Sequence, residues 1–588
     1  MSAAARGRSR RGDGRSKKRS AKTGRFSLLL GILALGLVLV AGRLIYIQMI
    51  VGPAYAADAA EQRTRDIVLS PDRGFILDRE GEVLAESMQA RTVYAVPSAV
   101  QDKQATAAAL AQVLGGQEAD YLEKLSKEAT FVYLARKVEV ERAESLEALG
   151  IQGLGFLEDS RRVYPNNELA CQVLGFVGVD DEGLSGIELY YNDLLSGEPG
   201  RLISERDPVG RPIPGGVTEE LDPVNGQDVV LTIDADIQYQ AQVMLAETVE
   251  EWGAKSGSVL VMDPTNGELL AMASLPTFNP NNYRAAKEAA YRNRPLVDTY
   301  EPGSTIKAMT ASAVIDVGLF TPDSVIRLPP TLKVGGSTIH DAHTRATTVN
   351  WTLTDIVTHS SNIGAAKVAM ALGGDGLYDY FSRFGLTQMT GVDFPGEVKG
   401  WLPPTDEWSG SSIGTIPFGQ GLSVTPIQLA RAFAVIANGG QLVTPHFLKS
   451  VPDSPSLDVS WPTIAADIDP STCETMRSVL VNVVKEGTAT RGKVKGYQVA
   501  GKTGTAQKAR SDGKAGYAAG KYVASFTGFI PANEPQVLIL ITLDEPTKAI
   551  YGGTVGGPMF SKLAAYCVEH LKIPPGDPVT PASQPDGG

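Results

Sequence analysis

The sequence predicts an α+β protein in which one large mixed domain follows an elongated N-terminal segment and a membrane helix. Three observations lead to this prediction. A long apolar run lies near the N-terminus, at residues 26–51, and a stretch rich in glycine and proline follows at residues 170–225. The rest of the chain shows strand patterns, then helical patterns, then strand patterns again. That order is typical of one α+β domain whose sheet uses both ends of its chain.

Charge separates the N-terminus from the rest of the chain. The 588 residues hold 54 Lys and Arg against 66 Asp and Glu, which gives a net charge of −12. Residues 1–25 carry ten basic residues and one acid, a local charge of +9 that leaves −21 on the remainder. The acidic remainder argues against a nucleic-acid-binding protein. A basic head before an apolar run indicates a boundary between two compartments.

Residues 26–51 are predicted to be a transmembrane helix, although Arg43 interrupts their apolar pattern. About 20 residues at about 1.5 Å each cross a bilayer core of roughly 30 Å. The alternative is a cleaved signal peptide, because residues 54–56 read Ala-Tyr-Ala, the pattern of a cleavage site. The apolar run exceeds the roughly 7–15 residues of a signal peptide, which favours a retained anchor. The positive-inside rule then places the basic head, residues 1–25, in the cytoplasm and the body outside it.

Residues 52–225 form a predicted pedestal of mixed texture. Its first part, residues 52–72, is predicted to be a helix that leaves the membrane. Residues 78–81 predict a turn between two short strands, and residues 103–149 are predicted to be helical from their Ala and Leu periodicity. The glycines and prolines of residues 170–225 predict an extended structure of several parts, without one compact core.

Residues 226–572 form the predicted large domain. It begins with a strand at 229–233, a helix at 237–252 and a hairpin whose turn is at 264–267. Helical patterns dominate from about residue 304 to residue 440. Further elements complete the domain, namely strands at 497–503, 521–530 and 536–544 and a helix at 558–571. The final residues, 573–588, are rich in Pro, Gly and Ser and predict a disordered tail.

Ser304 and Lys307 are the first candidate catalytic residues. They follow Pro302-Gly303 and open a predicted helix. Residues i and i+3 lie on one face of a helix, so the two side chains are expected to meet. A lysine held partly out of water can lose its proton and activate the serine hydroxyl. Taken alone, this spacing is weak evidence, because an N-capping serine beside a solvated lysine has the same sequence pattern.

Two further motifs strengthen the case. Ser360-Ser361-Asn362 follows a predicted helix, and Lys502-Thr503-Gly504, continued by Thr505, lies on a predicted strand. A strand with a cation, hydroxyl donors and a glycine can recognise a carboxylate and let a substrate backbone approach closely. Each motif alone has a structural explanation. Their order S-x-x-K, S-x-N, K-T-G within one predicted domain is hard to obtain by chance and resembles that of penicillin-binding proteins and serine β-lactamases.

The chain resembles the class B high-molecular-weight penicillin-binding proteins, the monofunctional peptidoglycan transpeptidases, over nearly its whole length. Similar sequence elements lie in the pedestal at residues 73–85 and 183–188, and around Ser304 at residues 300–304 and 418–428. The resemblance implies a transpeptidase domain with an antiparallel sheet flanked by helices and a helical subdomain. It also implies that the pedestal is of the dimerisation type.

The resemblance also implies the role of each motif residue. Ser304 attacks the penultimate D-Ala carbonyl of a D-Ala-D-Ala stem peptide, and Lys307 is the base. Ser360 relays the proton to the leaving amine, while Asn362 hydrogen-bonds Lys307 or the substrate amide. The terminal carboxylate, or that of a β-lactam, binds the strand formed by Lys502, Thr503, Gly504 and Thr505. The backbone N–H groups of Ser304 and Thr505 form the oxyanion hole.

Partners and location follow from the same resemblance. The implied partners are peptidoglycan stem peptides and their lipid-linked precursor polymer, β-lactams, the membrane, a polytopic glycan polymerase and other divisome membrane proteins. No metal or organic cofactor and no nucleic acid is implied. Residues 526–529, 544–546 and 551–560 look most like the division and sporulation branches. We therefore expect a single-pass cell-membrane protein at the division septum, with an elongation or sporulation role as the alternative.

Other functions compete with this one. A β-lactamase shares the three motifs, but the anchor, the pedestal and the lack of an identifiable deacylating glutamate argue against it. A β-lactam sensor would carry several membrane spans and a cytoplasmic effector, whereas the sequence predicts one span and no such effector, which argues against this function. A non-catalytic division scaffold is the alternative of a different class, and the three intact motifs disfavour it.

Several other residues are expected to be structural. His340 and His343 bracket Asp341, but a metal site there lacks an identifiable third protein ligand. Glu188 is predicted to be an ion-pair partner in the pedestal. The cysteines are far apart in sequence and are predicted to be separate, reduced core residues, at Cys171, Cys473 and Cys567.

Overall fold

The computed structural model describes residues 20–55, 64–205, 218–452, 454, 459–510 and 516–577. The chain divides into two compact units, residues 1–69 with 199–223, and residues 70–198 with 224–588. Most of the predicted basic head and of the predicted tail, residues 1–19 and 578–588, lies outside the described residues.

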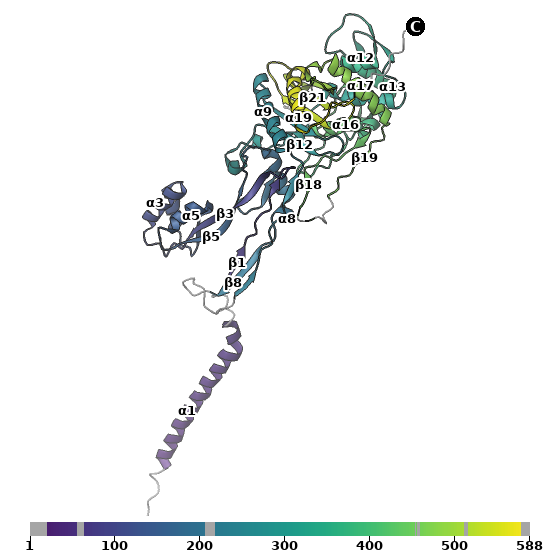
Figure 1. Cartoon of the computed structure of the whole chain (residues 1–588). Coiled ribbons are helices and arrows are strands. Elements are labelled where there is room, and N and C mark those ends of the chain that lie inside the picture. Colours follow the sequence, from purple (N-terminus) through teal and green to yellow (C-terminus); the bar gives the residue numbers. More distant parts are fainter. Residues whose placement is uncertain are drawn as a thin grey trace, which may run out of the picture. The chain divides into compact units, whose positions relative to one another are not determined.

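The first unit contains an apolar helix, α1 (Ser20–Ile45), which continues as a π-helical turn, η1 (Tyr46–Val51) (Figure 1). Residues 24–55 are long and apolar enough to cross a membrane. The helix therefore extends on both sides of the predicted span. The Arg43 guanidinium lies 5.3 Å from the centre of the Tyr46 ring. The attraction between the guanidinium and the ring offsets part of the cost of a charged side chain close to the end of an apolar helix.

The same unit contains a small antiparallel sheet of β1 (Thr64–Leu69), β8 (Gly200–Glu205) and β9 (Thr218–Leu221). The pairing runs from Thr64 opposite Glu205 to Leu69 opposite Gly200. The prediction of a helix over residues 52–72 is therefore wrong for β1. Its pairing partner lies more than 130 residues away in sequence, and local periodicity carries no information about such a partner.

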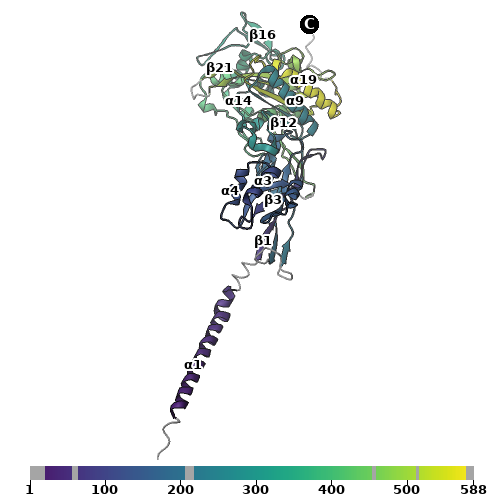
Figure 2. The same ribbon diagram turned by 90° about the vertical axis from the view of Figure 1, so that its left-hand side faces the viewer.

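The second unit begins with a lobe of three long strands, β3 (Val83–Ala95), β4 (Val132–Glu139) and β5 (Leu154–Val163). Figure 2 shows the helices that accompany it, α3 (Lys103–Leu114) and α4 (Glu118–Leu125), and α5 (Val140–Glu147) is the third. The lobe has its own buried core, which includes Leu110, Leu125, Leu134 and Leu146. The prediction of helix throughout residues 103–149 is wrong at β4, because pairing with β3 overrides the local helical pattern.

The stretch 170–198 contains more regular structure than the predicted extended chain. Short helices alternate with short strands there, in the order α6 (Cys171–Leu174), β6 (Phe176–Val177), β7 (Gly183–Ser185), α7 (Gly186–Tyr190) and α8 (Asn192–Leu195). Glu188 on α7 is fully buried and forms ion pairs of 2.6 Å with Arg73 and 2.7 Å with Arg162. The prediction that Glu188 is an ion-pair partner is therefore confirmed.

One sheet joins the pedestal segment to the large domain. β2 (Ile76–Leu77) pairs with β3 through the predicted turn at residues 78–81, and it also pairs in parallel with β10 (Val229–Leu231). β10 pairs in turn with β18 (Leu448–Ser450). The two parts of the second unit thus share backbone hydrogen bonds as well as side-chain contacts.

The central sheet of the large domain has the order β12-β11-β22-β21-β20 and is antiparallel throughout. Its first two strands, β11 (Ser256–Met262) and β12 (Leu269–Leu275), form the predicted hairpin. The other three come from the C-terminal part of the chain, β20 (Ala500–Ala509), β21 (Tyr517–Ile530) and β22 (Val537–Asp544). The prediction of a sheet built from both ends of the domain is therefore confirmed.

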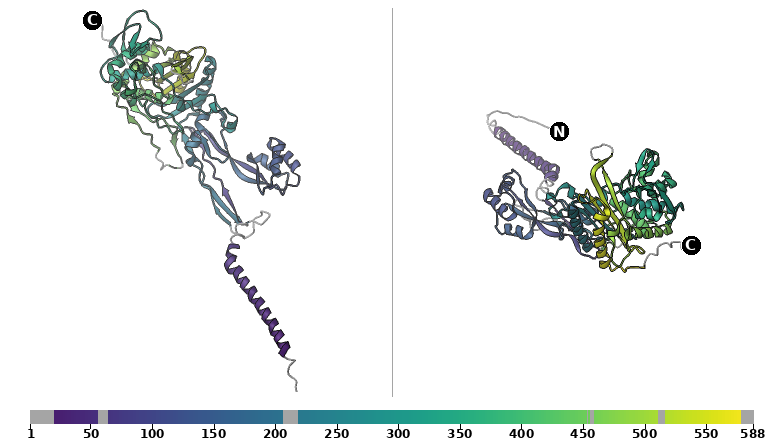
Figure 3. Two further views of the ribbon diagram at one scale, coloured as in Figure 1. Left: turned by 180° about the vertical axis from the view of Figure 1, so that it is seen from behind. Right: turned by 90° about the horizontal axis from the view of Figure 1, so that it is seen from above.

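Two helices pack on one face of this sheet, α9 (Ala235–Trp252) and α19 (Gly557–His570) (Figure 2). α16 (Pro426–Asn438), nearly all of which is buried, packs on the sheet from the helical subdomain. The subdomain also contains α11 (Lys307–Asp316), α12 (Leu353–Thr358), α13 (Asn362–Leu372), α14 (Gly374–Arg383) and α17 (Pro470–Lys485). Figure 3 shows these green and teal helices beside the yellow C-terminal strands.

Short strands interrupt the region predicted to be mainly helical, residues 304–440. β13 (Val325–Leu328) pairs with β16 (Val349–Thr352), and β14 (Leu332–Val334) pairs with β15 (Ser337–Ile339). The three cysteines are buried and free, as predicted.

Candidate active site

Ser304 lies where the helical subdomain meets the edge of the central sheet. It belongs to a 3-10 turn, η4 (Gly303–Ile306), that leads directly into α11. Gly303 has φ of +55°, and a side chain there would lie 3.1 Å from the carbonyl oxygen of Thr505. This position therefore requires glycine for both its backbone conformation and its close approach to β20. The turn holds Ser304, which is half-buried, beside the strand.

A second segment, residues 416–424, fixes the backbone around Ser304. Tyr300 and Val424 exchange two backbone hydrogen bonds of 3.0 and 2.9 Å, and the Gly303 N–H donates to the Gly419 carbonyl at 3.2 Å. The Gly421 N–H donates to the Glu301 carboxylate at 2.9 Å. Gly419 comes so close that a side chain there would lie 2.2 Å from the Gly303 oxygen. These bonds limit the freedom of the chain that carries the nucleophile.

Lys307 is one turn beyond Ser304, and its Nζ lies 3.0 Å from the Ser304 Oγ. The side chain is 1% exposed, and its amine also contacts the Ser360 carbonyl at 2.6 Å and the Asn362 Oδ1 at 2.7 Å. Burial lowers the pKa of Lys307 well below its ordinary value, and the nearby charge of Lys502 lowers it further. Asp341 opposes this effect, but the cation has no direct carboxylate partner in the described chain.

Ser360 and Asn362 lie between α12 and α13. Ser360 adopts the left-handed conformation with φ of +61°, which is uncommon for a residue with a side chain. This conformation turns both its carbonyl and its hydroxyl toward Lys307, whose Nζ lies 3.2 Å from the Ser360 Oγ. Asn362 donates from its amide nitrogen to the His340 carbonyl at 2.9 Å, which fixes its oxygen on Lys307.

The K-T-G motif lies on β20, the outermost strand of the central sheet among the described residues. Lys502 is fully buried and donates to the Ser360 Oγ at 3.0 Å. Burial lowers the pKa of Lys502 to about 7. Thr503 Oγ1 lies 2.8 Å from Thr488 Oγ1, and Thr505 accepts from the Gly552 N–H at 3.3 Å.

Gly504 explains why the motif ends in glycine. A side chain there would lie 2.3 Å from the Ser525 hydroxyl and 2.8 Å from the Pro302 carbonyl. The nucleophile turn can therefore lie directly against β20 only if this residue has no side chain. The structure thus brings the eight predicted site residues, which come from three distant parts of the sequence, to one place.

The arrangement joins two buried lysines through one hydroxyl. Ser360 Oγ lies 3.2 Å from Lys307 Nζ and 3.0 Å from Lys502 Nζ. Two like charges this close disfavour each other, so one lysine is readily neutral. A neutral amine has a lone pair that can take the proton of the Ser304 hydroxyl. The site therefore has the components of a serine nucleophile with a lysine base.

Comparison with known proteins decides the family. Residues 257–565 match the penicillin-binding protein transpeptidase domain, and residues 68–231 match the penicillin-binding protein dimerisation domain. The chain is 35% identical to a probable peptidoglycan D,D-transpeptidase, PbpC of Pseudomonas aeruginosa, over 94% of its own length and 96% of that protein's. The chain belongs to the class B penicillin-binding proteins.

Other relatives of this penicillin-binding protein differ in their named roles. Stage V sporulation protein D of Bacillus subtilis is 34% identical over 94% of this chain and 86% of its own length. The peptidoglycan D,D-transpeptidase FtsI of Escherichia coli is 33% identical over 94% of this chain and 92% of its own length. The protein is thus a serine-type peptidoglycan D,D-transpeptidase, and the predicted fold class is confirmed.

The solved structures agree with this assignment. The crystal structure of penicillin-binding protein 3 from Mycobacterium tuberculosis in complex with aztreonam has a TM-score of 0.68 and 29% identity. The match covers 88% of this penicillin-binding protein and all of that chain. That relative binds a β-lactam in its crystal structure.

The sequence alone assigned no role in the site to two acidic residues of this penicillin-binding protein, Asp341 and Glu301. Asp341 accepts hydrogen bonds from the Ser361 hydroxyl at 2.9 Å and from the Ile363 N–H at 3.0 Å, and it pairs with Arg345. It thereby fixes the loop that carries Ser360 and Asn362. The described residues contain no group of three His, Cys, Asp or Glu side chains placed to hold a metal.

Glu301 is the second missed acid. Its carboxylate accepts from the Gly421 N–H, and burial raises the pKa of Glu301. Glu301 lies three residues before Ser304 in the sequence. This closeness was a local signal that its side chain could help to hold the nucleophile turn. No spacing rule could have predicted the role of Asp341, because Ser361 and Ile363, which it binds, lie 20 and 22 residues away in sequence.

Proposed function

We propose that this protein crosslinks peptidoglycan stem peptides through an acyl-enzyme on Ser304, in septal wall synthesis, and that β-lactams inhibit it covalently. The observation that carries the chemical part is the buried network of Ser304, Lys307, Ser360 and Lys502. Its lysines lack direct carboxylate partners in the described chain and have lowered pKa values. This supports a Lys307 that gives up its proton more readily than an ordinary lysine and is able to act as a base.

The proposed reaction has two halves. Ser304 Oγ attacks the carbonyl of the penultimate D-Ala while Lys307 takes its proton. The peptide bond to the terminal D-Ala then breaks, and Ser360 passes the proton to the leaving amine. An amine from a neighbouring stem next attacks the ester, restores the Ser304 hydroxyl and forms the crosslink. Asn362 is assigned to the contact with Lys307, which the structure contains, or to the substrate amide.

Recognition of the substrate is assigned to β20. Lys502 supplies positive charge near the substrate's terminal carboxylate, and the Thr503 and Thr505 hydroxyls donate hydrogen bonds to it. Gly504 keeps the edge of the strand narrow. The backbone N–H groups of Ser304 and Thr505 form the oxyanion hole, in which one donor is worth roughly 3–4 kcal/mol in other enzymes. A β-lactam carries the same carboxylate beside its reactive carbonyl and would occupy the same place.

The location follows from the N-terminal unit. Residues 1–25 are assigned to the cytoplasm, 26–51 to the membrane, 52–225 to the pedestal and 226–572 to the transpeptidase domain. The apolar α1 supports a single-pass anchor. The anchor and pedestal are proposed to contact a polytopic glycan polymerase and other divisome membrane proteins. Similarity to FtsI supports a septal role. Similarity to the sporulation protein leaves a role in sporulation as the alternative.

The chemical part is tested by labelling the full-length protein with a fluorescent penicillin. The wild type is expected to form a stable covalent adduct, Ser304→Ala is expected to form none, and Ser409→Ala, which changes an exposed serine away from the site, is expected to label normally. A wild type that stays unlabelled would contradict the proposal and favour a non-catalytic scaffold.

The cellular part is tested by depletion and by localisation of a fluorescent fusion. A septal enzyme is expected to gather at the division site, and its depletion is expected to give filaments. A uniform side-wall signal would instead indicate elongation, and a signal confined to sporulating cells would indicate the sporulation branch.

A further inference from the structure

The lobe of the dimerisation domain has an apolar patch on the face of its sheet that the core leaves open. Figure 1 shows this lobe, with its labels α3, α5, β3 and β5, to one side of the other parts of the second unit. Its core lies on one face of the sheet and includes Val93 and Leu134. Successive side chains of a strand point to opposite faces, so Tyr94 and Tyr133 lie on the open face. We call the patch the lobe face, and its residues are Tyr94, Phe131, Tyr133 and Leu157.

Backbone pairing brings these residues together. Tyr94 on β3 lies opposite Tyr133 on β4, and Thr92 lies opposite Leu157 on β5. The Phe131 ring stacks on the Tyr94 ring with centres 4.7 Å apart, and the Tyr133 ring meets the Phe131 ring edge-on at the same distance. Three rings from neighbouring strands thus form one continuous aromatic surface.

The sheet holds the Tyr94 ring in place. A side chain on Gly155, the residue opposite Tyr94 on β5, would lie 2.1 Å from the Tyr94 Cζ. The ring therefore lies directly on the backbone of β5, and only glycine leaves room for it. An aromatic ring held in this way has few conformations to lose, so the lobe face is formed before any ligand binds.

The lobe face is exposed over an area that is small for a protein interface. Phe131 is 39% exposed, Tyr133 49% and Leu157 37%. An aromatic side chain has about 150–250 Å² of surface, so the exposed apolar area is roughly 200–300 Å². A patch of this size on a soluble protein is often functional. A stable protein partner needs about 800 Å² on each side, whereas a short stretch of a thin polymer is enough to cover this area.

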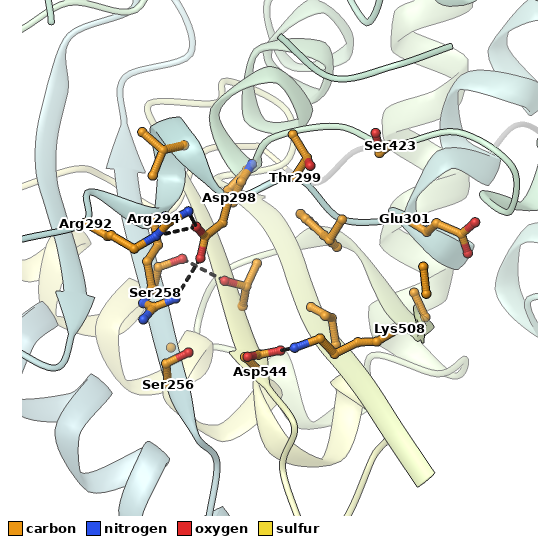
Figure 4. Close-up of a pocket in the computed structure, with 18 of the residues that line it drawn as sticks. Ser256, Ser258, Arg292, Arg294, Asp298, Thr299, Glu301, Ser423, Lys508 and Asp544 are labelled. Carbon is orange, nitrogen blue, oxygen red and sulfur yellow. Dashed lines mark hydrogen bonds and ion pairs between the residues drawn. The ribbon is translucent and has the colours of Figure 1, made fainter. Parts of the chain in front are cut away.

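The lobe face differs in charge from the cavity beside the nucleophile turn. Figure 4 shows that cavity, of about 520 Å³, where charged side chains form ion pairs such as Lys508 with Asp544 at 2.6 Å. None of the four residues of the lobe face carries a charge. A charged ligand would lose water there without gaining an ionic partner, so the lobe face suits an uncharged one.

Polar groups border the aromatic rings. Thr92 lies on the same face as Tyr94 and donates to the Asp159 carboxylate at 2.5 Å. The Arg136 guanidinium lies 5.6 Å from the centre of the Tyr133 ring. A sugar ring has an apolar face of C–H groups and a rim of hydroxyl and amide groups. Exposed aromatic rings with donors and acceptors at their border therefore match a chain of sugars better than an apolar ligand.

We propose that the lobe face binds the glycan backbone of peptidoglycan, at a site separate from Ser304. This inference rests on the proposed transpeptidase function, which supplies the polymer. The backbone is a chain of N-acetylated sugars, and the faces of its rings pack on Phe131 and Tyr133 while their rims bond to the bordering polar groups. A strand held at the lobe keeps its stems near the active site, which raises their effective concentration there.

The binding test uses a glycan without stems. Full-length protein is acylated with penicillin to block Ser304, and calorimetry measures its affinity for a chitin oligosaccharide, a chain of N-acetylglucosamine. The acylated and free proteins are expected to bind it equally. Loss of binding on acylation would place the glycan in the active site and overturn the inference. A wild type that binds no glycan in either form would also overturn it and would leave the lobe face to a protein partner.

Substitutions locate the binding. Tyr133→Ala removes the most exposed ring and is expected to weaken the affinity about tenfold, as the loss of a central aromatic contact does. Tyr133→Trp keeps an aromatic ring and is expected to retain the affinity. Tyr239→Ala removes a ring on α9 that is 57% exposed and is expected to bind as the wild type does. Unchanged affinity in Tyr133→Ala would overturn the inference.

Turnover separates this role from catalysis. Tyr133→Ala and the wild type are compared on glycan strands that carry stems and on a free pentapeptide that ends in D-Ala-D-Ala. On the strands, the variant is expected to raise KM about tenfold at an unchanged kcat, because binding alone is lost. On the free peptide it is expected to match the wild type. An equal loss on both substrates would contradict a glycan site, because the free peptide has no glycan backbone.

Failure of the proposed function would look different. A wild type that penicillin does not acylate would refute the serine chemistry. The affinity of full-length Ser304→Ala for the chitin oligosaccharide, with and without Tyr133→Ala, would still decide whether the lobe face binds glycan. Equal affinities of these two proteins would contradict the site.

Discussion

Two clusters of buried charge lie in the second unit, and they are built in opposite ways. In the dimerisation domain, Glu188 is fully buried between Arg73 at 2.6 Å and Arg162 at 2.7 Å. In the active site, Lys307 and Lys502 are equally buried, but hydroxyl, carbonyl and amide groups are their direct partners. In the first cluster each ion faces an opposite charge, and in this sense we call it balanced. In the second, like charges face each other, and we call it unbalanced.

The difference shows in the pKa values. Burial alone would raise the pKa of Glu188, but the charges of Arg162 and Arg73 outweigh burial and lower it. For the lysines, burial lowers both pKa values, and no bound carboxylate restores them. A balanced cluster keeps its ions charged and holds the fold, whereas an unbalanced one releases a proton and can act as a base.

The largest expected effect comes from removing the base. Lys307→Met keeps the length of the side chain and removes the amine, so acylation by fluorescent penicillin is expected to fall by about 10²–10⁴. The folded state should tolerate the change, since no opposite charge is left unpaired. Lys367→Met on α13 is the matched control and should acylate normally. The Lys367 amine donates to the Arg327 carbonyl and makes no contact with the catalytic residues, all of which the structure describes. Unchanged acylation in Lys307→Met would remove Lys307 from the mechanism.

Neutralising the balanced cluster should instead affect stability. Glu188→Gln leaves two buried guanidinium groups without their anion, which is expected to lower the free energy of unfolding by about 3–5 kcal/mol. Denaturant unfolding measures the change. Glu182→Gln alters an exposed acid a few residues away and should stay within about 0.5 kcal/mol of the wild type. A stable Glu188→Gln protein would mean that the cluster does not hold the domain together.

The unbalanced cluster predicts a pH-dependent stability. Lys502 has a folded pKa of about 7, below the ordinary value of 10.5, so between these pH values the unfolded chain binds one more proton. The stability of the wild type relative to Lys502→Met should therefore rise with pH in this window, by up to about 1.4 kcal/mol per pH unit. It should be flat below pH 7. A flat difference throughout would show that Lys502 stays charged in the fold.

The smallest expected effect concerns Ser361, whose role is structural, in contrast to its neighbour Ser360 in the catalytic network. Ser361 caps α13 by accepting from the Gly364 N–H at 3.0 Å, and its hydroxyl donates to Asp341. Ser361→Ala should therefore lower the free energy of unfolding by about 0.5–2 kcal/mol, as the loss of a cap does. Thermal unfolding would measure this, and an unchanged midpoint would show that Asp341 holds the loop without the cap.

Much of the site was predictable because its chemistry is local. Ser304 and Lys307 are one helical turn apart, and Lys502 to Thr505 lie on one strand, so their motifs are visible in the sequence. The features that connect these motifs were not visible. The left-handed Ser360, the hydroxyl shared by the two lysines, and Asp341 beneath the loop arise from tertiary contacts.

The fold divides in the same way. The hairpin of β11 and β12 was predicted because its turn, residues 264–267, consists of residue types that favour turns. β1 pairs with β8 more than 130 residues away, and β4 pairs with β3 inside a region with helical periodicity. Local patterns indicate that a segment can form a strand or a helix, but a distant partner decides which one forms.

The most direct test of the contrast is the protonation state of Lys307. An NMR titration of ¹³C-labelled lysine, assigned by the signal lost in Lys307→Met, follows the Cε resonance with pH. The unbalanced cluster predicts that Lys307 titrates well below 10.5 and that its signal moves again when Lys502→Met removes the facing charge. A Lys307 that titrates near 10.5 would contradict the account, because the serine would then have no neutral lysine as its base.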